Sequence, residues 1–417
     1  MNSQNILQQI NAEAKFIENS IGYQKTKIGT IPKDWKVKKL KDISNRVQRK
    51  NDGKSHNVLT ISSKGGFLNQ TERFSKVIAG ENLAKYILLR KNEFAYNKGN
   101  SKTYPYGCIY RLEDYEEVLV PNVYYCFEIR EGVTEFYKHY FIAGKLNKFL
   151  ARVINTGVRN DGLLNLNVTD FFDVPVAAPP IKEQQKIASI LSTWDKAIEL
   201  KEKLIEQKKQ QKKGLMQKLL TGEVRLPGFK DKWKTMLMSN CIDIMNGFPF
   251  KSEYFNEENI GIPLIRVRDI KAKEITTYYS GEFSNDYIIK RGDVIVGMDG
   301  EFNVTMWDKS EGLLNQRVMK IIPKVGYDLY FIYQLLIPKL KKIEQLTPST
   351  TVKHLSNKDV YGLKVKMPSF DEQKAIGKVL LCSDKEISLL ESELEILKKQ
   401  KKGLMQLLLT GKVRVKV

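Results

Sequence analysis

Two stretches of the chain, residues 187–219 and 376–408, carry apolar residues at alternating steps of four and three. Of ten positions sampled at this spacing, seven are apolar in the first stretch and eight in the second. That pattern predicts two long helices packed on each other as a coiled coil, each about 38 residues or roughly 57 Å long. An amphipathic helix lying on some other surface remains the alternative.

The two stretches belong to one duplicated segment. Residues 183–225 match residues 372–414 without a gap at an offset of 189, and 24 of the 43 pairs are identical, which indicates a duplicated domain pair. A pseudo-twofold axis across the pair would make the helices antiparallel. Gly214 and Gly403 lie inside these helices, where glycine is unfavourable, so we expect a break or a close backbone approach there.

Two segments of about 150 residues differ from the helices in their pattern of apolar and turn residues. Short apolar runs broken by turn residues, such as residues 118–120 and 262–265, predict strands. Short helices are expected at 136–151 and 327–345. The fold class is therefore α+β, with two globular domains and two long helices in an antiparallel coiled coil of pseudo-twofold symmetry.

The globular segments share an entrance and then diverge. Ile31-Pro-Lys-Asp-Trp35 resembles Phe229-Lys-Asp-Lys-Trp233, whereas Gly247-Phe-Pro-Phe-Lys-Ser252 has no twin in the first segment. One scaffold carrying two different surfaces suits a protein that reads two targets. The predicted order is a helical arm at 1–27, a first globular domain at 28–178, a helix at 179–222, a second globular domain at 223–367 and a helix at 368–417.

The net charge of +21, from 69 basic and 48 acidic residues, indicates a polyanionic partner, most often nucleic acid. The 55 Lys against 14 Arg can also follow from an A+T-rich genome. No apolar run approaches the roughly 18 residues of a membrane span, and the first thirty residues are too polar for a signal peptide, so we expect a soluble, cytoplasmic protein. Scattered Cys and His residues predict no metal site.

Catalytic signatures are missing from the sequence. The Asn-Pro-Pro-Tyr tetrapeptide of amino-methyltransferases does not occur, and Gly53-Lys-Ser55 lacks the earlier glycine of a phosphate loop. No Ser-His-Asp or Cys-His grouping follows from spacing. The chain is predicted to recognise a target without chemistry of its own.

Two divergent globular segments, each followed by a helix of the form Pro-x-x-x-Glu-Gln-x-x-Ile … Gln-Lys-Lys-Gly-Leu-Met-Gln-x-Leu-Leu-Thr-Gly, resemble the specificity subunit of type I restriction–modification enzymes. The entrance Gly29-Thr-Ile-Pro-x-x-Trp35 and the Gly247–Ser252 motif look like those of its target-recognition domains. The resemblance covers essentially the whole chain.

The resemblance implies a reader of a bipartite, asymmetric site in double-stranded DNA that docks two methyltransferase subunits and, through them, motor-nuclease subunits. The family's conserved helices set the spacing between half-sites. S-adenosylmethionine, ATP and Mg²⁺ belong to the other subunits, so no cofactor is expected on this chain. Bases are expected to be read in the major groove, while most Lys contacts go to phosphates.

Polar residues in Gly-rich loops are the candidates for DNA contact, although each is also compatible with a solvated loop. In the first domain they are Lys98, Asn100, Ser101, Lys102, Tyr104, Thr156, Arg159 and Asn160. In the second domain they are Lys251, Ser252, Arg266, Arg268, Thr350, Thr351, Lys353 and His354. A second basic set near the helix ends could serve a partner, DNA or only solvent: Lys208, Lys209, Lys212, Lys213, Lys398, Lys399, Lys401 and Lys402.

Two rival functions remain open at this point. A stand-alone two-headed transcription or architectural factor explains the charge and the duplication, but not why the helices match better than the readers. An RNA-binding accessory factor is disfavoured because the chain has no Gly-Phe-Gly-Phe aromatic motif.

Overall fold

The computed structural model describes residues 22–62, 66–69, 83–99, 103–158, 163–347 and 353–417. These residues form two compact units. Unit 1 comprises the described residues up to Glu202 together with Glu393–Val417, and unit 2 comprises Lys203–Ser392. Both boundaries fall inside a long helix, so each unit contains a globular part and half of each helix.

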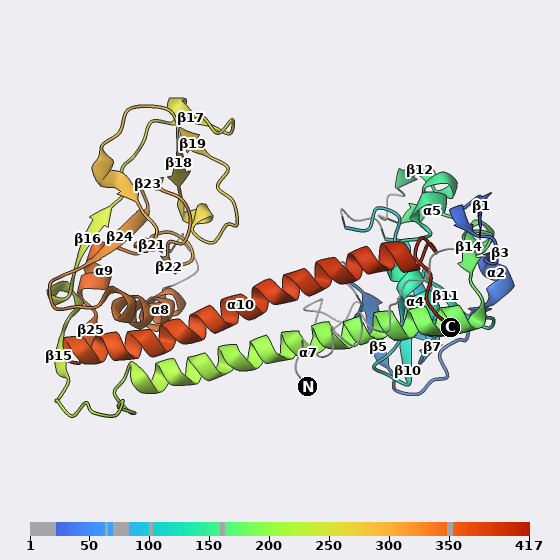
Figure 1. Cartoon of the computed structure of the whole chain (residues 1–417), viewed down its shortest axis with the longest axis horizontal. Helices are drawn as coiled ribbons and strands as arrows, with labels where there is room; N and C mark the ends of the chain where they lie inside the picture. Colours follow the sequence, from blue (N-terminus) through green and yellow to red (C-terminus); the bar gives the residue numbers. More distant parts are fainter. Residues whose placement is uncertain (1–21, 63–65, 70–82, 100–102, 159–162, 348–352) are drawn as a thin grey trace. The chain divides into compact units, whose positions relative to one another are not determined.

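The two long helices are α7 (Ile181–Leu219) and α10 (Phe370–Leu408), of 39 residues each (Figure 1). In unit 1, Lys401 near the end of α10 forms an ion pair with Asp195 near the start of α7. In unit 2, the Nζ atom of Lys212 lies 2.5 Å from Oδ1 of Asp384. Early residues of one helix thus face late residues of the other, and the predicted antiparallel pairing is confirmed within each unit.

The globular part of unit 1 is built on two four-stranded sheets. One has the order β6-β5-β10-β7 and the other β4-β11-β8-β9, with β5 and β10 parallel. Three further strand pairs are β1–β2, β3–β14 and β12–β13. The strands are β1 (Tyr23–Thr26), β2 (Gly29–Pro32), β3 (Lys36–Lys39), β4 (Ser44–Val47), β5 (Asn57–Ile61), β6 (Phe67–Asn69), β7 (Ile87–Arg90), β8 (Phe94–Asn97), β9 (Cys108–Arg111), β10 (Glu117–Val120), β11 (Tyr125–Ile129), β12 (Asn155–Val158), β13 (Leu164–Asn165) and β14 (Pro175–Ala178).

The globular part of unit 2 has a four-stranded sheet, β16-β24-β21-β22, and a five-stranded sheet, β17-β19-β18-β23-β20, in which β18 and β23 are parallel. Strand β15 pairs with β25. The strands are β15 (Lys234–Leu237), β16 (Ile242–Asn246), β17 (Phe255–Asn256), β18 (Ile262–Ile265), β19 (Tyr278–Tyr279), β20 (Ile288–Ile289), β21 (Val294–Gly297), β22 (Val304–Met306), β23 (Gly312–Leu314), β24 (Val318–Pro323) and β25 (Lys364–Met367).

The two globular parts share a topology that is not evident from their sequences. The order β4-β11-β8-β9 in unit 1 corresponds to β16-β24-β21-β22 in unit 2, and each unit adds one parallel strand pair to its second sheet. The sequence analysis found the globular segments barely related beyond their entrances. The structure corrects that interpretation, because strand order is retained where side chains are not.

The observed bounds of the shorter helices differ from the predicted ones. Unit 1 contains α2 (Leu40–Ile43), η1 (Leu83–Lys85), α4 (Thr134–Ile142), α5 (Asn147–Val153) and α6 (Val168–Phe172). Unit 2 contains η2 (Met238–Asn240), η3 (Ser252–Tyr254), η4 (Val267–Asp269), η5 (Asn285–Tyr287), α8 (Leu329–Leu346) and α9 (Asn357–Tyr361). The helix expected at 136–151 is split, since Gly144 has a φ of +65° after α4.

The predicted helical arm at 1–27 needs a correction at its end. Residues 23–26 form strand β1, which pairs with β2 in a hairpin. The hairpin is held by its own backbone ladder, which a helix over these residues would exclude. Residues 1–21 lie outside the described part of the chain.

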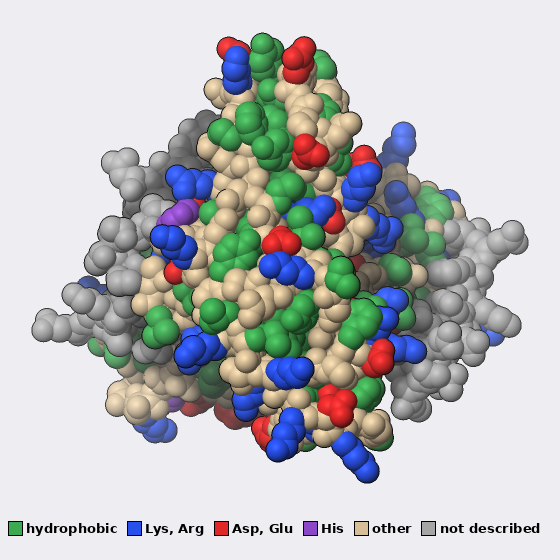
Figure 2. Space-filling model, turned by 90° about the vertical axis from the view of Figure 1, so that its left-hand side faces the viewer, with side chains coloured by type: hydrophobic (Ala, Val, Ile, Leu, Met, Phe, Trp, Pro, Cys, Tyr) green, Lys and Arg blue, Asp and Glu red, His purple; other side chains and the backbone are tan. Residues whose placement is uncertain are grey.

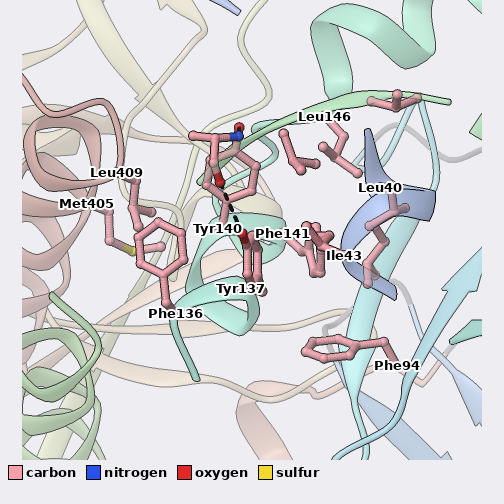
Figure 3. Packing of buried hydrophobic residues seen from close by; sticks show 14 of the residues in the cluster. Leu40, Ile43, Phe94, Phe136, Tyr137, Tyr140, Phe141, Leu146, Met405 and Leu409 are labelled. Carbon is pink, nitrogen blue, oxygen red and sulfur yellow. Dashed lines mark hydrogen bonds between the residues drawn. The ribbon is translucent and has the colours of Figure 1, made fainter. Parts of the chain in front are cut away.

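The core of unit 1 joins the globular part to the helix pair. Phe136 of α4 is fully buried, and Met405 of α10 and Leu409, the residue after α10, lie beside it (Figure 3). The Tyr137 hydroxyl donates to the carbonyl oxygen of Ala177 at 3.3 Å, shown as the dashed line in Figure 3. One continuous core therefore packs the globular part against the unit's own helices.

Each unit contains the same buried carboxylate at the start of a long helix. In unit 1, Oε1 and Oε2 of Glu183 accept hydrogen bonds from Nε and Nη2 of Arg414 at 2.7 and 2.9 Å, and Nε1 of Trp35 donates to Oε2 at 2.9 Å. In unit 2, Glu372 accepts the equivalent bonds from Arg225 and Trp233. Arg225 and Glu183 each lie 189 residues before their counterparts, so the duplication extends to this buried ion pair.

A second duplicated contact differs between the units in one residue. In unit 2, Nε2 of the fully buried Gln334 donates to Oδ2 of Asp384 at 2.7 Å. In unit 1, the equivalent place on α4 holds His139, whose Nδ1 lies 3.6 Å from Oδ2 of Asp195 and whose Nε2 lies 3.2 Å from the Ser192 hydroxyl. Burial lowers the pKa of His139 to about 4, although the Asp195 carboxylate acts in the opposite direction.

The two helix glycines do not mark breaks or close contacts. α7 continues through Gly214 and α10 through Gly403, and a Cβ atom built at either position meets no described atom within 4 Å. The expectation of a break or a close approach within this chain was therefore wrong. Intrahelical hydrogen bonding and the packed face of each helix tolerate one glycine without distortion.

We expect Gly214→Ala to raise the free energy of unfolding by up to about 1 kcal/mol, because alanine is the better helix former and its methyl group has space. Chemical denaturation measures the change. Gly411→Ala is the matched control: Gly411 has a φ of +67°, and its added Cβ would lie 2.5 Å from Cδ of Pro32, so this variant should be destabilised. A loss of stability in Gly214→Ala would contradict the prediction.

We expect Arg414→Ala to lower the free energy of unfolding by about 3 kcal/mol, since it leaves the Glu183 carboxylate, which is 2 % exposed, without its charged partner. Lys398→Ala removes a solvent-exposed ion pair with Glu202 and should cost less than about 1 kcal/mol. Equal losses in the two variants, measured by denaturant unfolding, would show that burial of the carboxylate does not decide the cost.

The free energy of unfolding should fall by about 3 kcal/mol between pH 6.5 and pH 4 because of His139. The unfolded state binds a proton near pH 6.5, while the folded state resists binding it until about pH 4, so stability is lost as the pH falls through this window. His139→Gln, which copies the unit 2 residue, should remove this contribution. Gln334→His should introduce a similar one, and a pH series of denaturation curves tests both.

Candidate nucleic-acid interface

Two of the predicted loops in unit 1 lie side by side. Strand β8 is followed by Lys98 and Gly99, and Gly99 forms an antiparallel bridge with Leu163. The backbone N–H of Leu164 donates to the carbonyl oxygen of Lys98 at 2.8 Å. This pairing places Lys98 and Gly99 next to the β12–β13 hairpin.

Not all of these candidates are described. Lys98 and Tyr104 are described, and Thr156 lies in β12, where only its backbone is described. The remaining first-domain candidates lie outside the described residues: Asn100, Ser101, Lys102, Arg159 and Asn160. Their roles in DNA contact stay predictions.

The described side chains of this site are supported by aromatic rings. The Nζ atom of Lys98 lies 5.0 Å from the ring centroid of Tyr125, and the hydroxyl groups of Tyr104 and Tyr110 lie 2.7 Å apart. Burial and the Tyr104 hydrogen bond raise the pKa of Tyr110. Burial also raises the pKa of the nearby Cys108 thiol to about 12. The described side chains of the site offer donors and aromatic faces for binding.

The candidates in unit 2 divide into separate places. Lys251 and Ser252 are exposed at η3, where the Nζ atom of Lys251 lies 3.9 Å from Glu253. Arg266 is engaged within the fold, since its Nε donates to Oδ2 of Asp269 at 3.1 Å and its Nη2 donates to the Thr277 hydroxyl. That engagement leaves Arg266 fewer donors for a ligand, and its role in DNA contact stays a prediction.

The other second-domain candidates lie in η4 and around residues 350–354. Arg268 is exposed in η4. Lys353 donates through Nζ to the carbonyl oxygen of Glu344, and His354 is exposed. Thr350 and Thr351 lie outside the described residues.

The fold of unit 2 brings two residues to His354 that the sequence analysis missed. Asp299 forms an antiparallel bridge with His354, and its Oδ1 atom lies 2.7 Å from Nδ1 of the imidazole. Oδ2 of Asp299 lies 3.5 Å from Nε of Arg317. The N–H of Leu355 also donates to the carbonyl oxygen of Met298 at 2.7 Å. These contacts place the loop after β21 against the segment before α9.

This arrangement repeats the one in unit 1. There, the loop after β8 pairs with the segment before α6, and β8 and β21 occupy the same position in their sheets. A sequence signal existed, because Gly297-Met-Asp-Gly300 follows an apolar strand much as Asn97-Lys-Gly99 does. Arg317 had no comparable signal, since a turn far away in sequence supplies it.

Most of the lysines near the helix ends contact the opposite helix. Acidic residues of that helix pair with Lys208, Lys209, Lys212, Lys398 and Lys401. These five therefore stabilise the helix pair, which answers the question that the sequence left open for them. On the face shown in Figure 2, Lys and Arg side chains are spread among acidic and hydrophobic ones instead of gathering in one area.

One described cluster has the residue types of a cation site. Single ligand atoms of Asp52, His56 and Glu117 all lie within 4.8 Å of one another, a grouping that sequence spacing did not suggest. Each carboxylate already has partners in the chain: Asp52 accepts from the backbone N–H of Lys54 at 3.0 Å and contacts His56, and Glu117 accepts from Arg90 at 2.9 Å. The Lys54 hydrogen bond, followed by that of His56, lowers the pKa of Asp52.

Comparison with known proteins places the chain in a family. The model of the type I restriction modification DNA specificity domain matches residues 32–210 and again residues 230–399. The EcoBI type I restriction enzyme specificity subunit of Escherichia coli is 38 % identical over 188 residues, which span 44 % of this chain and 40 % of that subunit. The MjaIX specificity subunit of Methanocaldococcus jannaschii is 23 % identical over 94 % of this chain and 96 % of its own length.

A solved structure has the same fold. The S subunit of a type I restriction–modification system from M. genitalium superposes with a TM-score of 0.57 at 16 % identity, covering 94 % of this chain and 97 % of that one. Among the described residues, no helix combines the length and apolar character needed to cross a membrane. The two family matches each take in one globular segment and most of the following long helix, and the chain belongs to the family of type I restriction modification DNA specificity domains.

Proposed function

We propose that the chain is the DNA-recognition subunit of a type I restriction–modification system and that each unit reads one half of a bipartite, asymmetric site. The observation that supports this most strongly is the duplication of the scaffold without duplication of the loops. Both units share strand order and the buried Arg–Glu–Trp contact, yet the paired loops carry Lys98 and Tyr104 in unit 1 and Asp299 and His354 in unit 2.

The chemistry of the proposed system belongs to other subunits. This chain supplies recognition, while two methyltransferase subunits with S-adenosylmethionine would modify adenine. Motor-nuclease subunits with ATP and Mg²⁺ would cleave unmodified DNA.

DNA is the polyanion that the net charge of +21 favours, and the loops differ in a way that suits sequence reading. Contacts of lysine to phosphates would position the duplex, and the side chains of the paired loops would distinguish bases. The alternative of a stand-alone transcription or architectural factor gains no support from the family match.

Exchange of residues 28–178 for the corresponding segment of a relative should change one half of the methylated consensus and leave the other half intact. The reason is that the loops of unit 1 are built entirely from this segment. The exchange retains Glu183 and Arg414, which form the buried ion pair at the helix pair. Sequencing of methylated adenines in cells that carry the chimaera and its methyltransferase measures both halves. A change in both halves, or in neither, would contradict the two-reader proposal.

A further inference from the structure

The turn between β23 and β24 holds an arginine in a backbone conformation that arginine rarely adopts. Arg317 has a φ of +70°, and the other described non-glycine residues with positive φ are Asn92 and Asn259. Asparagine tolerates the left-handed region better than other residues with a Cβ atom. A strained residue persists where the surroundings determine it, and such residues cluster at binding sites.

Backbone hydrogen bonds from two distant segments fix this turn. The N–H of Met298 donates to the carbonyl oxygen of Arg317 at 2.9 Å, and the N–H of Gln316 donates to that of Phe248 at 2.9 Å. Gly247 must be glycine, since a Cβ atom there would lie 2.0 Å from the carbonyl oxygen of Asn315. The Gly247–Ser252 motif, which the sequence analysis singled out for Lys251 and Ser252, therefore supports Arg317.

The side chain of Arg317 is oriented as well as its backbone. Its Nε atom faces Oδ2 of Asp299 at 3.5 Å, and its Nη1 atom lies 3.5 Å from Nδ1 of His354. The imidazole is itself held by Oδ1 of Asp299 at 2.7 Å. The side chain of Arg317 remains 56 % exposed, so an oriented guanidinium is accessible to a ligand.

We propose that Arg317 reads a guanine in the half-site recognised by unit 2 and that Asp299 positions its guanidinium. The planar fork of N–H donors matches the O6 and N7 acceptors of guanine in the major groove, which is the commonest specific contact to a base. This inference rests on the proposed function, since it names the base that one unit recognises.

Unit 1 has a different residue at the equivalent turn. Tyr124, which precedes β11 as Arg317 precedes β24, is 5 % exposed. Its hydroxyl lies 2.9 Å from that of Thr60 and accepts from the N–H of Ile61 at 3.1 Å. The tyrosine is thus part of the core, and reading through this turn is specific to unit 2.

The test is the methylated-adenine consensus directed by the full chain in complex with its methyltransferase, with Arg317→Lys and Arg317→Gly compared with the wild type. Lysine keeps the charge and loses the fork, and glycine relieves the backbone and loses both. We expect each variant to relax one G·C pair, in the half that the 28–178 exchange leaves unchanged. Discrimination at that pair should fall by roughly 5- to 150-fold. Asp299→Asn should relax the same pair more weakly.

Arg291→Ala, another exposed arginine of unit 2, is the control and should leave the consensus unchanged. Thermal melting should show Arg317→Gly at least as stable as the wild type, which excludes misfolding as the cause. Uniformly weaker methylation with an intact consensus would identify a phosphate contact and overturn the inference. So would relaxation in the other half, or a unit 2 half-site without guanine. A wild-type chain that directs no consensus would overturn the proposed function itself.

Discussion

The rest of the structure depends on a buried carboxylate at the start of each long helix. Glu183 and Glu372 are nearly inaccessible to solvent, so each needs a charged partner in the folded chain. Arg414 and Arg225 supply that partner from the segment that follows the other long helix, and Trp35 and Trp233 supply an indole donor from the entrance of each globular part. One interaction therefore joins three separate parts of the chain within each unit.

The scaffold that this interaction holds together must stay constant, whereas the loops that it carries are free to vary. Lysines of one helix pair with acids of the other, and the globular parts share the strand order of one four-stranded sheet, so helix pairing and this sheet are the same in both units. The described residues of the loops after β8 and β21 carry none of these contacts. Residues there can change without loss of the scaffold, and for that reason a duplicated protein can present two different surfaces.

The sequence predicted the helices well, because a seam with a spacing of 3.5 residues and a gapless repeat are local signals. It predicted that Lys98 and Thr156 lie in loops, whereas the structure places Thr156 in strand β12 and pairs the segment after Lys98 with the β12–β13 hairpin. It missed the shared topology of the globular parts, since strand pairing constrains burial more than residue identity. It also missed Asp299 and Arg317, because long-range backbone contacts alone bring them to His354. The prediction of a break at Gly214 was wrong, because the low helix propensity of a single glycine does not by itself distort a helix.

The basic residues of the chain serve two different purposes in the structure. A net charge of +21 indicates a polyanion, yet five of the eight lysines near the helix ends pair with acids of the opposite helix. An ion-paired lysine gains less from a phosphate than an unpaired one, because it must first lose its partner. The electrostatic attraction for DNA must therefore come mainly from other basic residues, while the helix lysines are used for assembly. Different lysines of one chain thus attract DNA and pair the helices. A substitution that changes DNA affinity therefore need not alter the scaffold.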